Sequence, residues 1–143
     1  MKKILSLLLL AAIPALGMAQ ANSPVGTWQS VDEEGEKKAV VKITQDNNGD
    51  LRGTIIKLNQ KPGALCEKCE GDKKGKPIEG MDIIWSLKKV GDNAWAEGAI
   101  LDPAKGETYN VKAELIDNGQ KLKLRGFIGV SLFGRTQVWD RVQ

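Results

Sequence analysis

Residues 108–119 constrain the fold of this chain most, because they join a regular strand pattern to a tight turn. From 108 to 116 the side chains alternate, with Tyr109, Val111, Ala113 and Leu115 opposed by Asn110, Lys112 and Glu114. A period of two is typical of a β-strand with one buried face. The turn 117–119 has the sequence Asp-Asn-Gly, and Asn and Gly accept the positive φ that a tight hairpin requires. The segment therefore predicts an antiparallel sheet.

Further segments with strand patterns are separated by turn residues. They are 25–31, 38–44, 51–58, 81–88, 94–101, 121–128 and 133–142. In 81–88 the alternation places Met81, Ile83, Trp85 and Leu87 on one face, opposed by Asp82, Ile84, Ser86 and Lys88. No amphipathic helix pattern of ordinary length interrupts residues 22–143, so about eight antiparallel strands are the economical prediction. Closure into an up-and-down barrel pairs both sheet edges and buries the inward face of every strand.

The N-terminal segment 1–21 has the features of a secretory signal peptide. Lys2 and Lys3 precede a short Leu-rich run, and small residues allow cleavage after Ala19 or Ala21. The run is too short to span a bilayer, and no Cys near the cleavage region can accept a lipid. We therefore expect an exported protein, periplasmic or secreted, that is neither membrane-spanning nor lipid-anchored. The remaining residues 22–143 have the size of one domain.

Composition argues against several classes of function. Once Lys2 and Lys3 are removed, the net charge falls from +3 to near +1, and no basic run with interleaved aromatic residues predicts nucleic-acid binding. Histidine is absent, which excludes Ser-His-Asp and Cys-His catalysis and removes the commonest metal ligand. For the carboxylates of Asp102, Glu107 and Asp140 we expect turn and surface roles. The sequence thus predicts neither an enzyme nor a cofactor.

Residues 59–80 form a charged loop that holds both cysteines of the chain, Cys66 and Cys69. In an exported chain a structural disulfide is the first interpretation. A disulfide that closes so short a ring adds roughly 2 kcal/mol of stability through chain entropy. It would therefore stiffen the loop more than it would hold the barrel together. A redox dithiol and a metal site are the alternatives, but the loop lacks a βαβ setting and the chain has no further thiol and no imidazole. The length of the loop also suggests a lid over one mouth of the barrel.

The first strand begins with Gly26-Thr27-Trp28, which resembles the Gly-x-Trp opening of lipocalin and other calycin barrels. In those barrels the Trp plugs one end, and a basic residue near the end of the last strand lies across it. Pairing of the first strand with the last would bring Arg141 beside Trp28, whereas Arg135 lies nearer the other end of its strand. A cation–π contact of this kind contributes roughly 0.5 to 2 kcal/mol.

Ordered motifs extend the resemblance over nearly all of residues 22–143. They are SPVGTW, the Cys66-x-x-Cys69 loop with Gly71 and Pro77, GMDIIWSLKK, ILDPAKGETY and LKLRGFIGVSLFGRTQVW. Their succession is similar to a bacterial family known as domain of unknown function 2147. The resemblance implies an exported, lipocalin-like barrel and supplies no established activity and no catalytic residue.

Two candidate functional surfaces follow from the barrel prediction. The inward side chains chosen to line a cavity for a small apolar ligand are Ile83, Trp85, Tyr109, Val111 and Leu124, and each of them is also suited to a packed core. Residues 126–134 crowd apolar side chains between glycines, where turns are normally polar. They pack on the barrel or extend two strands, or they form a rim that meets a hydrophobic ligand, a membrane surface or a partner.

Three hypotheses for function remain at this point. The first is an exported barrel that binds a small hydrophobic ligand in its interior or at its rim. The second is a ligand-free envelope or protein-interaction module that acts through residues 126–134. The third is a small thiol redox factor that uses Cys66 and Cys69.

Overall fold

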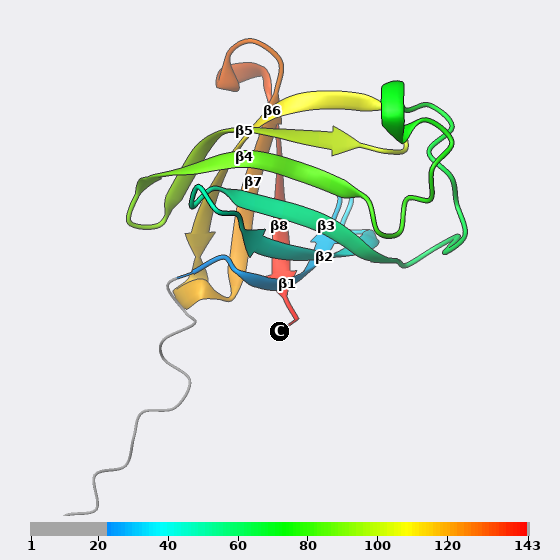
Figure 1. Ribbon diagram of the computed structural model, residues 1–143. Helices are drawn as coiled ribbons and strands as arrows, with labels where there is room; N and C mark the ends of the chain where they lie inside the picture. The colour runs from blue at the N-terminus through cyan, green and yellow to red at the C-terminus, as the bar shows by residue number, and fades with distance from the viewer. Residues whose placement is uncertain (1–22, 143) are drawn as a thin grey trace, which may run out of the picture.

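The structure, a computed structural model, describes residues 23–142 as one closed antiparallel barrel of eight strands (Figure 1). The strands are β1 (Gly26–Val31), β2 (Lys37–Gln45), β3 (Leu51–Leu58), β4 (Asp82–Gly91), β5 (Ala94–Asp102), β6 (Glu107–Ile116), β7 (Lys121–Phe127) and β8 (Arg135–Arg141). Short 3₁₀ helices in the connections are η1 (Gly71–Lys73), η2 (Asp117–Gly119) and η3 (Ser131–Phe133). The predicted up-and-down barrel is confirmed. The signal peptide predicted for residues 1–21 lies outside the described residues.

The connections divide the barrel into two ends. Both termini of the described chain and the β2–β3, β4–β5 and β6–β7 connections lie at one end, which we call the closed end. The β1–β2, β3–β4, β5–β6 and β7–β8 connections lie at the other, the open end. The open end carries the two longest connections, residues 59–81 and 128–134. The predicted strand 133–142 begins only at Arg135, because residues 131–133 turn as η3.

Trp28 and Arg141 seal the closed end, where β1 pairs with β8 and these two residues are opposite each other. The Arg141 guanidinium lies 4.4 Å from the centre of the Trp28 ring, the contact expected from the Gly-x-Trp motif. It also donates hydrogen bonds to the carbonyls of Gly119 (2.8 Å), Val25 (3.1 Å) and Ser23 (2.5 Å). Burial lowers the pKa of Arg141 below its usual value. One side chain thus joins the N-terminal segment, the β6–β7 turn and the last strand.

Large side chains fill the half of the barrel next to the closed end. The buried inward residues there are Trp28, Val41, Ile43, Leu51, Leu87, Trp95, Ala113, Leu115, Leu122, Leu124 and Trp139. Glycines make room for them: a Cβ on Gly98 would lie 2.9 Å from Leu87 Cδ1, and one on Gly53 would lie 3.0 Å from the Ile84 side chain. Small residues in this half therefore serve close packing and do not open a cavity.

The facing pattern predicted for 81–88 was wrong, because β4 contains irregularities. Its register against β3 pairs Ile84 with Gly53 and Asp82 with Thr54, so Ile83 is an extra residue, and Ile83 and Ile84 are both buried. A second shift follows at Ser86, which has a φ of 56°. Each extra residue exchanges the two faces of a strand. Trp85 consequently lies on the outer face and not with the inward side chains.

Candidate functional site

The candidate site is the mouth of the barrel at the open end, which we define by Ile100, Tyr109, Gly126, Arg135 and Gln137. Strand register places all five on inward positions. Ile100, Tyr109 and Gly126 are half-buried, whereas the inward residues nearer the closed end are buried. A Cβ on Gly126 would find its nearest neighbours at 3.7 Å on Tyr109 and at 3.9 Å on the Ile100 side chain and the Asn110 carbonyl. The barrel is therefore packed below and roomier at this mouth.

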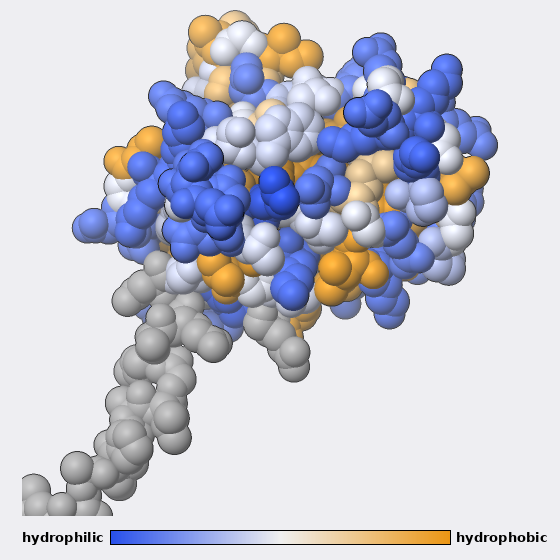
Figure 2. Space-filling model, in the orientation of Figure 1, coloured by the Kyte–Doolittle hydropathy of each residue, from blue (hydrophilic) through white to orange (hydrophobic). Residues whose placement is uncertain are grey.

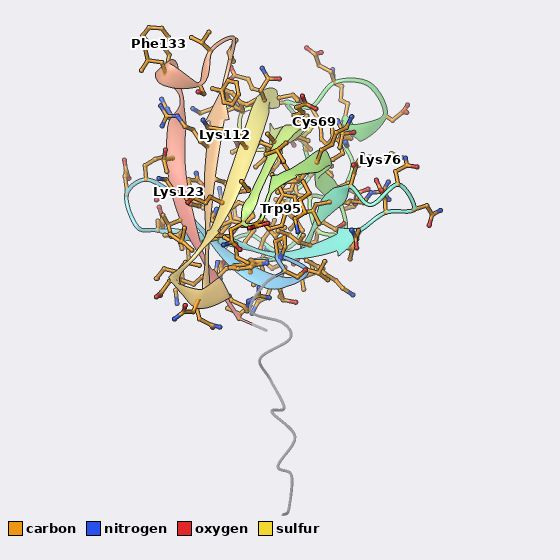
Figure 3. All side chains as sticks on the ribbon, turned by 90° about the vertical axis from the view of Figure 1, so that its left-hand side faces the viewer. Cys69, Lys76, Trp95, Lys112, Lys123 and Phe133 are labelled. Atoms are coloured by element: carbon orange, nitrogen blue, oxygen red, sulfur yellow. A yellow bond between two sulfur atoms is a disulfide. The ribbon has the colours of Figure 1, made fainter. Side chains whose placement is uncertain are left out.

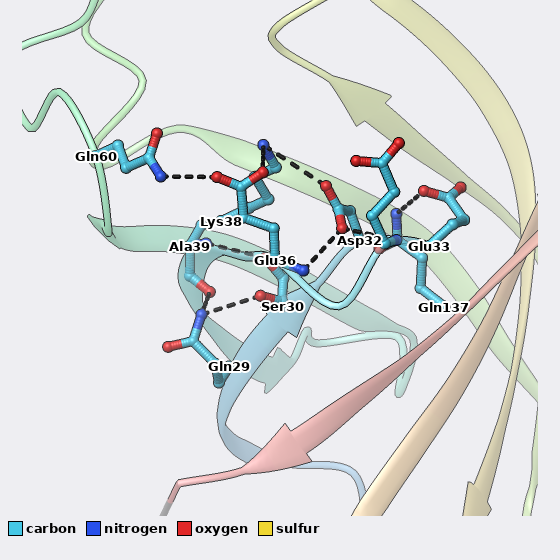
Figure 4. Close-up of polar contacts among 10 residues, drawn as sticks. Gln29, Ser30, Asp32, Glu33, Glu36, Lys38, Ala39, Gln60 and Gln137 are labelled. Atoms are coloured by element: carbon cyan, nitrogen blue, oxygen red, sulfur yellow. Dashed lines mark hydrogen bonds and ion pairs between the residues drawn. The ribbon is translucent and has the colours of Figure 1, made fainter.

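Polar groups surround this apolar mouth. The Tyr109 hydroxyl donates to the Glu107 carboxylate. Gln137 accepts a hydrogen bond from Trp139 Nε1 at 2.9 Å. It donates one to Glu33 at 3.5 Å, which Figure 4 shows. Arg135 pairs with Gly126 at the start of β8 and is exposed. An apolar floor under a polar rim is the usual composition of a small-molecule site.

Tyr109 is held in its neutral form by the groups around it. Its hydrogen bond to Glu107 is the main cause that raises the pKa of Tyr109 from 10.0 to about 12. Burial and the negative charges of Glu107 and Asp102 act in the same direction, and Arg135 opposes them. The mouth therefore offers a neutral phenol rather than a phenolate across ordinary pH.

We expect the folded protein to titrate its tyrosine about two pH units later than the unfolded chain does. The chain has one tyrosine, so its near-ultraviolet tyrosinate absorbance reports Tyr109 alone. A raised folded-state pKa adds stability below pH 10, and this stability is lost as the pH rises from 10 to about 12. Glu107→Gln should move the midpoint back toward 10, and a midpoint near 10 in the folded wild type would contradict the bond.

The β1–β2 turn gives one side of the rim a fixed shape (Figure 4). The Asp32 carboxylate accepts the backbone N–H groups of Glu34 and Glu36, each at 2.9 Å. Gln60 of the long loop donates to Glu36 at 2.8 Å, and Lys38 lies 3.1 Å from the same carboxylate. These bonds lower the pKa of Asp32 and of Glu36. The turn that carries Glu33 is thereby tied to the long β3–β4 loop.

Cys66 and Cys69 form a disulfide, and both are buried although their loop is charged. Backbone bonds from Cys66 N–H to the Lys76 carbonyl and from Gly75 N–H to the Cys66 carbonyl, both 2.8 Å, fold the loop on itself. The loop also docks on the β5–β6 turn, where Cys66 Sγ lies 3.4 Å from the Pro103 carbonyl oxygen. The disulfide therefore sits within a packed contact between two connections of the open end.

Part of the loop packs against the outer face of the barrel. Lys73 lies 4.5 Å above the ring of Trp85, on the outer face of β4. A shallow depression of about 440 Å³ lies between η1 and the start of β4, bounded by residues from Asp72 to Asp82. Trp85 thus contacts the loop, and its assignment as a lining residue of the interior was wrong.

The remaining predicted lining residues divide between core and mouth. Ile83, Val111 and Leu124 belong to the buried core, whereas Tyr109 is at the mouth. Sequence reasoning missed Ile100 and Gly126 as neighbours of Tyr109, and it missed Gln137 as a residue of the mouth. The signal that locates them is the register of β5 to β8, which brings together positions far apart in the sequence.

The carboxylates of Asp102 and Asp140, which the sequence offered as candidates for chemistry, make contacts that stabilise the fold. Asp102 accepts the N–H of Ala104 in the β5–β6 turn at 3.0 Å, and Asp140 pairs with Lys121 at 2.6 Å. Within residues 23–142, no group of three or more Cys, Asp and Glu side chains is arranged to hold a metal ion. No helix in the part of the chain that the structure describes is long and apolar enough to cross a membrane.

Comparison with known proteins identifies the family. The family described as "Uncharacterized protein conserved in bacteria (DUF2147)" matches residues 26–141, from the start of β1 to the end of β8. The chain belongs to the DUF2147 family. The resemblance seen in the sequence motifs is thereby confirmed. No curated protein matches this DUF2147 sequence.

A solved structure shares the fold of this DUF2147 protein. The chain is similar to HP1028 from the human pathogen Helicobacter pylori, which is described as belonging to the lipocalin family. The two are 19% identical, with a TM-score of 0.75 over 85% of this chain and 84% of that chain. The barrel is therefore lipocalin-like, and the likeness concerns the fold alone.

Proposed function

We propose that this DUF2147 protein binds a small, mostly apolar molecule at the mouth of its barrel. The observation that carries the proposal is the half-buried group of Ile100, Tyr109 and Gly126 above a packed floor. An apolar body would lie on these residues, and a polar group would reach Arg135, Gln137 or the Tyr109–Glu107 pair at the rim. A lipocalin-like barrel is compatible with such binding.

The packing below the mouth limits how deep a ligand can sit. A molecule in the lower half of the barrel would have to displace buried side chains such as Val111, Leu122 or Trp139. Displacing close-packed side chains costs several kcal/mol, so a shallow seat is favoured. A ligand held by a few side chains at a rim is expected to bind with about micromolar affinity.

A substitution that fills the mouth of the barrel with a larger side chain tests the proposal. Gly126→Leu places a branched side chain between Tyr109 and Ile100. We expect binding of an apolar fluorescent probe such as anilinonaphthalene sulfonate to weaken at least tenfold. Gly63→Leu adds the same side chain where no atom lies within 4 Å, so it is the matched control. Equal probe binding by both variants would refute a site at the mouth.

We further infer that the protein is exported, periplasmic or secreted. Support comes from the signal-like segment 1–21 and from a disulfide in a bacterial family. Cell fractionation and the intact mass of the purified protein test this inference. Native mass spectrometry of the same material would reveal any small molecule retained from its own compartment.

The room available at the mouth can be compared directly with the packing below it. Gly98→Ala puts a methyl group 2.9 Å from Leu87 and is expected to lower the free energy of unfolding by roughly 1 to 3 kcal/mol. Gly126→Ala meets nothing closer than 3.7 Å and should be nearly neutral. Urea unfolding followed by tryptophan fluorescence measures both. If Gly126→Ala is the more costly change, the mouth is packed like the core.

The two other hypotheses make different predictions. A thiol redox factor needs an accessible sulfur, and the burial of Cys66 and Cys69 argues against it. Thiol counting after mild reduction of the folded protein tests this point, because a protected disulfide should remain intact. An interaction module is favoured by one observation, the exposed apolar connection between β7 and β8.

A further inference from the structure

The β7–β8 connection exposes a compact group of apolar side chains, which we call the tip: Ile128, Val130, Leu132 and Phe133. Their exposed fractions are 71%, 59%, 77% and 79%. In Figure 2 the connection forms a mostly hydrophobic projection at the top of the molecule. Monomeric proteins rarely present contiguous apolar side chains in this way without a function for them. The tip does not pack on the barrel, so the packing alternative considered from the sequence was wrong.

The tip is held in a defined conformation by Arg125. Its guanidinium donates to the carbonyls of Ser131 (2.5 Å) and Leu132 (3.1 Å) and to the Thr136 hydroxyl (2.7 Å). The backbone N–H of Phe133 adds a bond to the Val130 carbonyl at 3.3 Å. The apolar side chains are therefore displayed by a built loop, and their exposure does not come from a loose chain.

Basic side chains of β6 and β7 lie next to the tip on the outer face of the barrel. Lys112 and Arg125 are opposite each other on β6 and β7, and Lys112 Nζ lies 3.3 Å from Ser131 Oγ. Lys123 precedes Arg125 by two positions on β7 and shares its outer face. Figure 3 shows Lys112, Lys123 and Phe133 on the same side of the molecule. Among the described residues, none of these three cations, Lys112, Lys123 and Arg125, forms an ion pair.

We propose that the tip inserts into the interface of a membrane that contains anionic phospholipid. Apolar burial and attraction to anionic headgroups together give reversible membrane binding, and the two sets of groups lie side by side here. The tip projects from the surface, so it fits a fluid interface better than the shaped surface of a protein partner. The protein remains peripheral, since only this connection enters the bilayer.

Vesicle binding by the full mature chain tests the proposal. We expect cosedimentation with vesicles of phosphatidylglycerol and phosphatidylethanolamine, much weaker binding to phosphatidylcholine alone, and loss of binding at high salt. Leu132→Ser and Phe133→Ser should each weaken binding roughly tenfold, because each removes an apolar side chain from the interface. Lys112→Gln combined with Lys123→Gln should abolish the preference for anionic vesicles.

Matched controls lie at the closed end. Val90 in the β4–β5 hairpin is 59% exposed, like Val130, so Val90→Ser should leave vesicle binding unchanged while Val130→Ser weakens it. Lys88→Gln with Lys89→Gln is the matched change of charge on exposed positions of β4. Circular dichroism checks that every variant is folded.

A reporter on the tip distinguishes insertion from surface attraction. Both native cysteines are in the disulfide, so Leu132→Cys supplies a single thiol for a nitrobenzoxadiazole label. Its emission should rise and shift to the blue on anionic vesicles, whereas the same label at Val90→Cys should not change. The proposal is overturned if wild type does not bind these vesicles, if tip and control variants bind alike, or if the tip instead mediates self-association or binds a partner protein in the absence of lipid.

Discussion

Arg141→Met is expected to lower the free energy of unfolding by about 3 kcal/mol. The change removes the cation from the face of Trp28, where the guanidinium lies 4.4 Å from the ring centre. It also leaves the carbonyls of Ser23, Val25 and Gly119 without their donor at the closed end. Methionine keeps the apolar stem, so the loss reports the charge and its hydrogen bonds. Urea unfolding monitored by tryptophan fluorescence gives the value.

Arg52→Met is the control for this prediction. Arg52 is half-exposed and has one ion pair, at 3.6 Å from Asp82, which is worth less than about 1 kcal/mol. Arg141→Lys should fall between wild type and Arg141→Met, because an ammonium keeps the charge but cannot reach the same three carbonyls at once. If Arg141→Met is no more costly than Arg52→Met, Arg141 does not seal the barrel.

Gly106→Ala is expected to detach the disulfide loop from the β5–β6 turn. A Cβ on Gly106 would lie 1.9 Å from the Lys68 carbonyl oxygen, and the residue has a φ of +68°. We expect a loss of roughly 3 kcal/mol, made up of about 1 kcal/mol for a side chain at positive φ and the rest from the displaced loop. The buried disulfide should then be reduced faster by dithiothreitol, which thiol counting over time measures.

Gly75→Ala separates the steric effect from the backbone effect. Gly75 lies in the same loop with a φ of +72°, but no atom is within 4 Å of its added Cβ. This variant should lose about 1 kcal/mol and keep the wild-type rate of disulfide reduction. Equal rates of reduction in both variants would mean that contact with the β5–β6 turn does not protect Cys66 and Cys69.

Much of the barrel could be predicted from the sequence because its signals are local. The alternation in 108–116 and the Asp-Asn-Gly turn after it gave the bounds of β6 within one residue. The contact of Arg141 with Trp28 followed from a short motif and from antiparallel closure of the first strand on the last. Both inferences depend on neighbours in the chain and on topology, which a single sequence carries.

The errors arose where one residue shifts a register or where distant segments meet. The extra residue Ile83 and the shift at Ser86 moved Trp85 to the outer face, and alternation alone cannot reveal such shifts. The docking of Cys66 beside Pro103 joins connections 37 residues apart and leaves no local pattern. Likewise, nothing near Arg125 in the sequence indicates that it holds the carbonyls of residues 131 and 132.

The pairing of β1 with β8 determines when this chain can finish folding. Only two residue pairs join these strands in register, and they connect Trp28 and Gln29 with the last residues of the described barrel. The first strand must therefore wait for the last one to be synthesised before it gains its second neighbour. Contacts so far apart in sequence form slowly. Until then Trp28 lacks the Arg141 side chain that covers it, so the barrel closes only after its last strand is present.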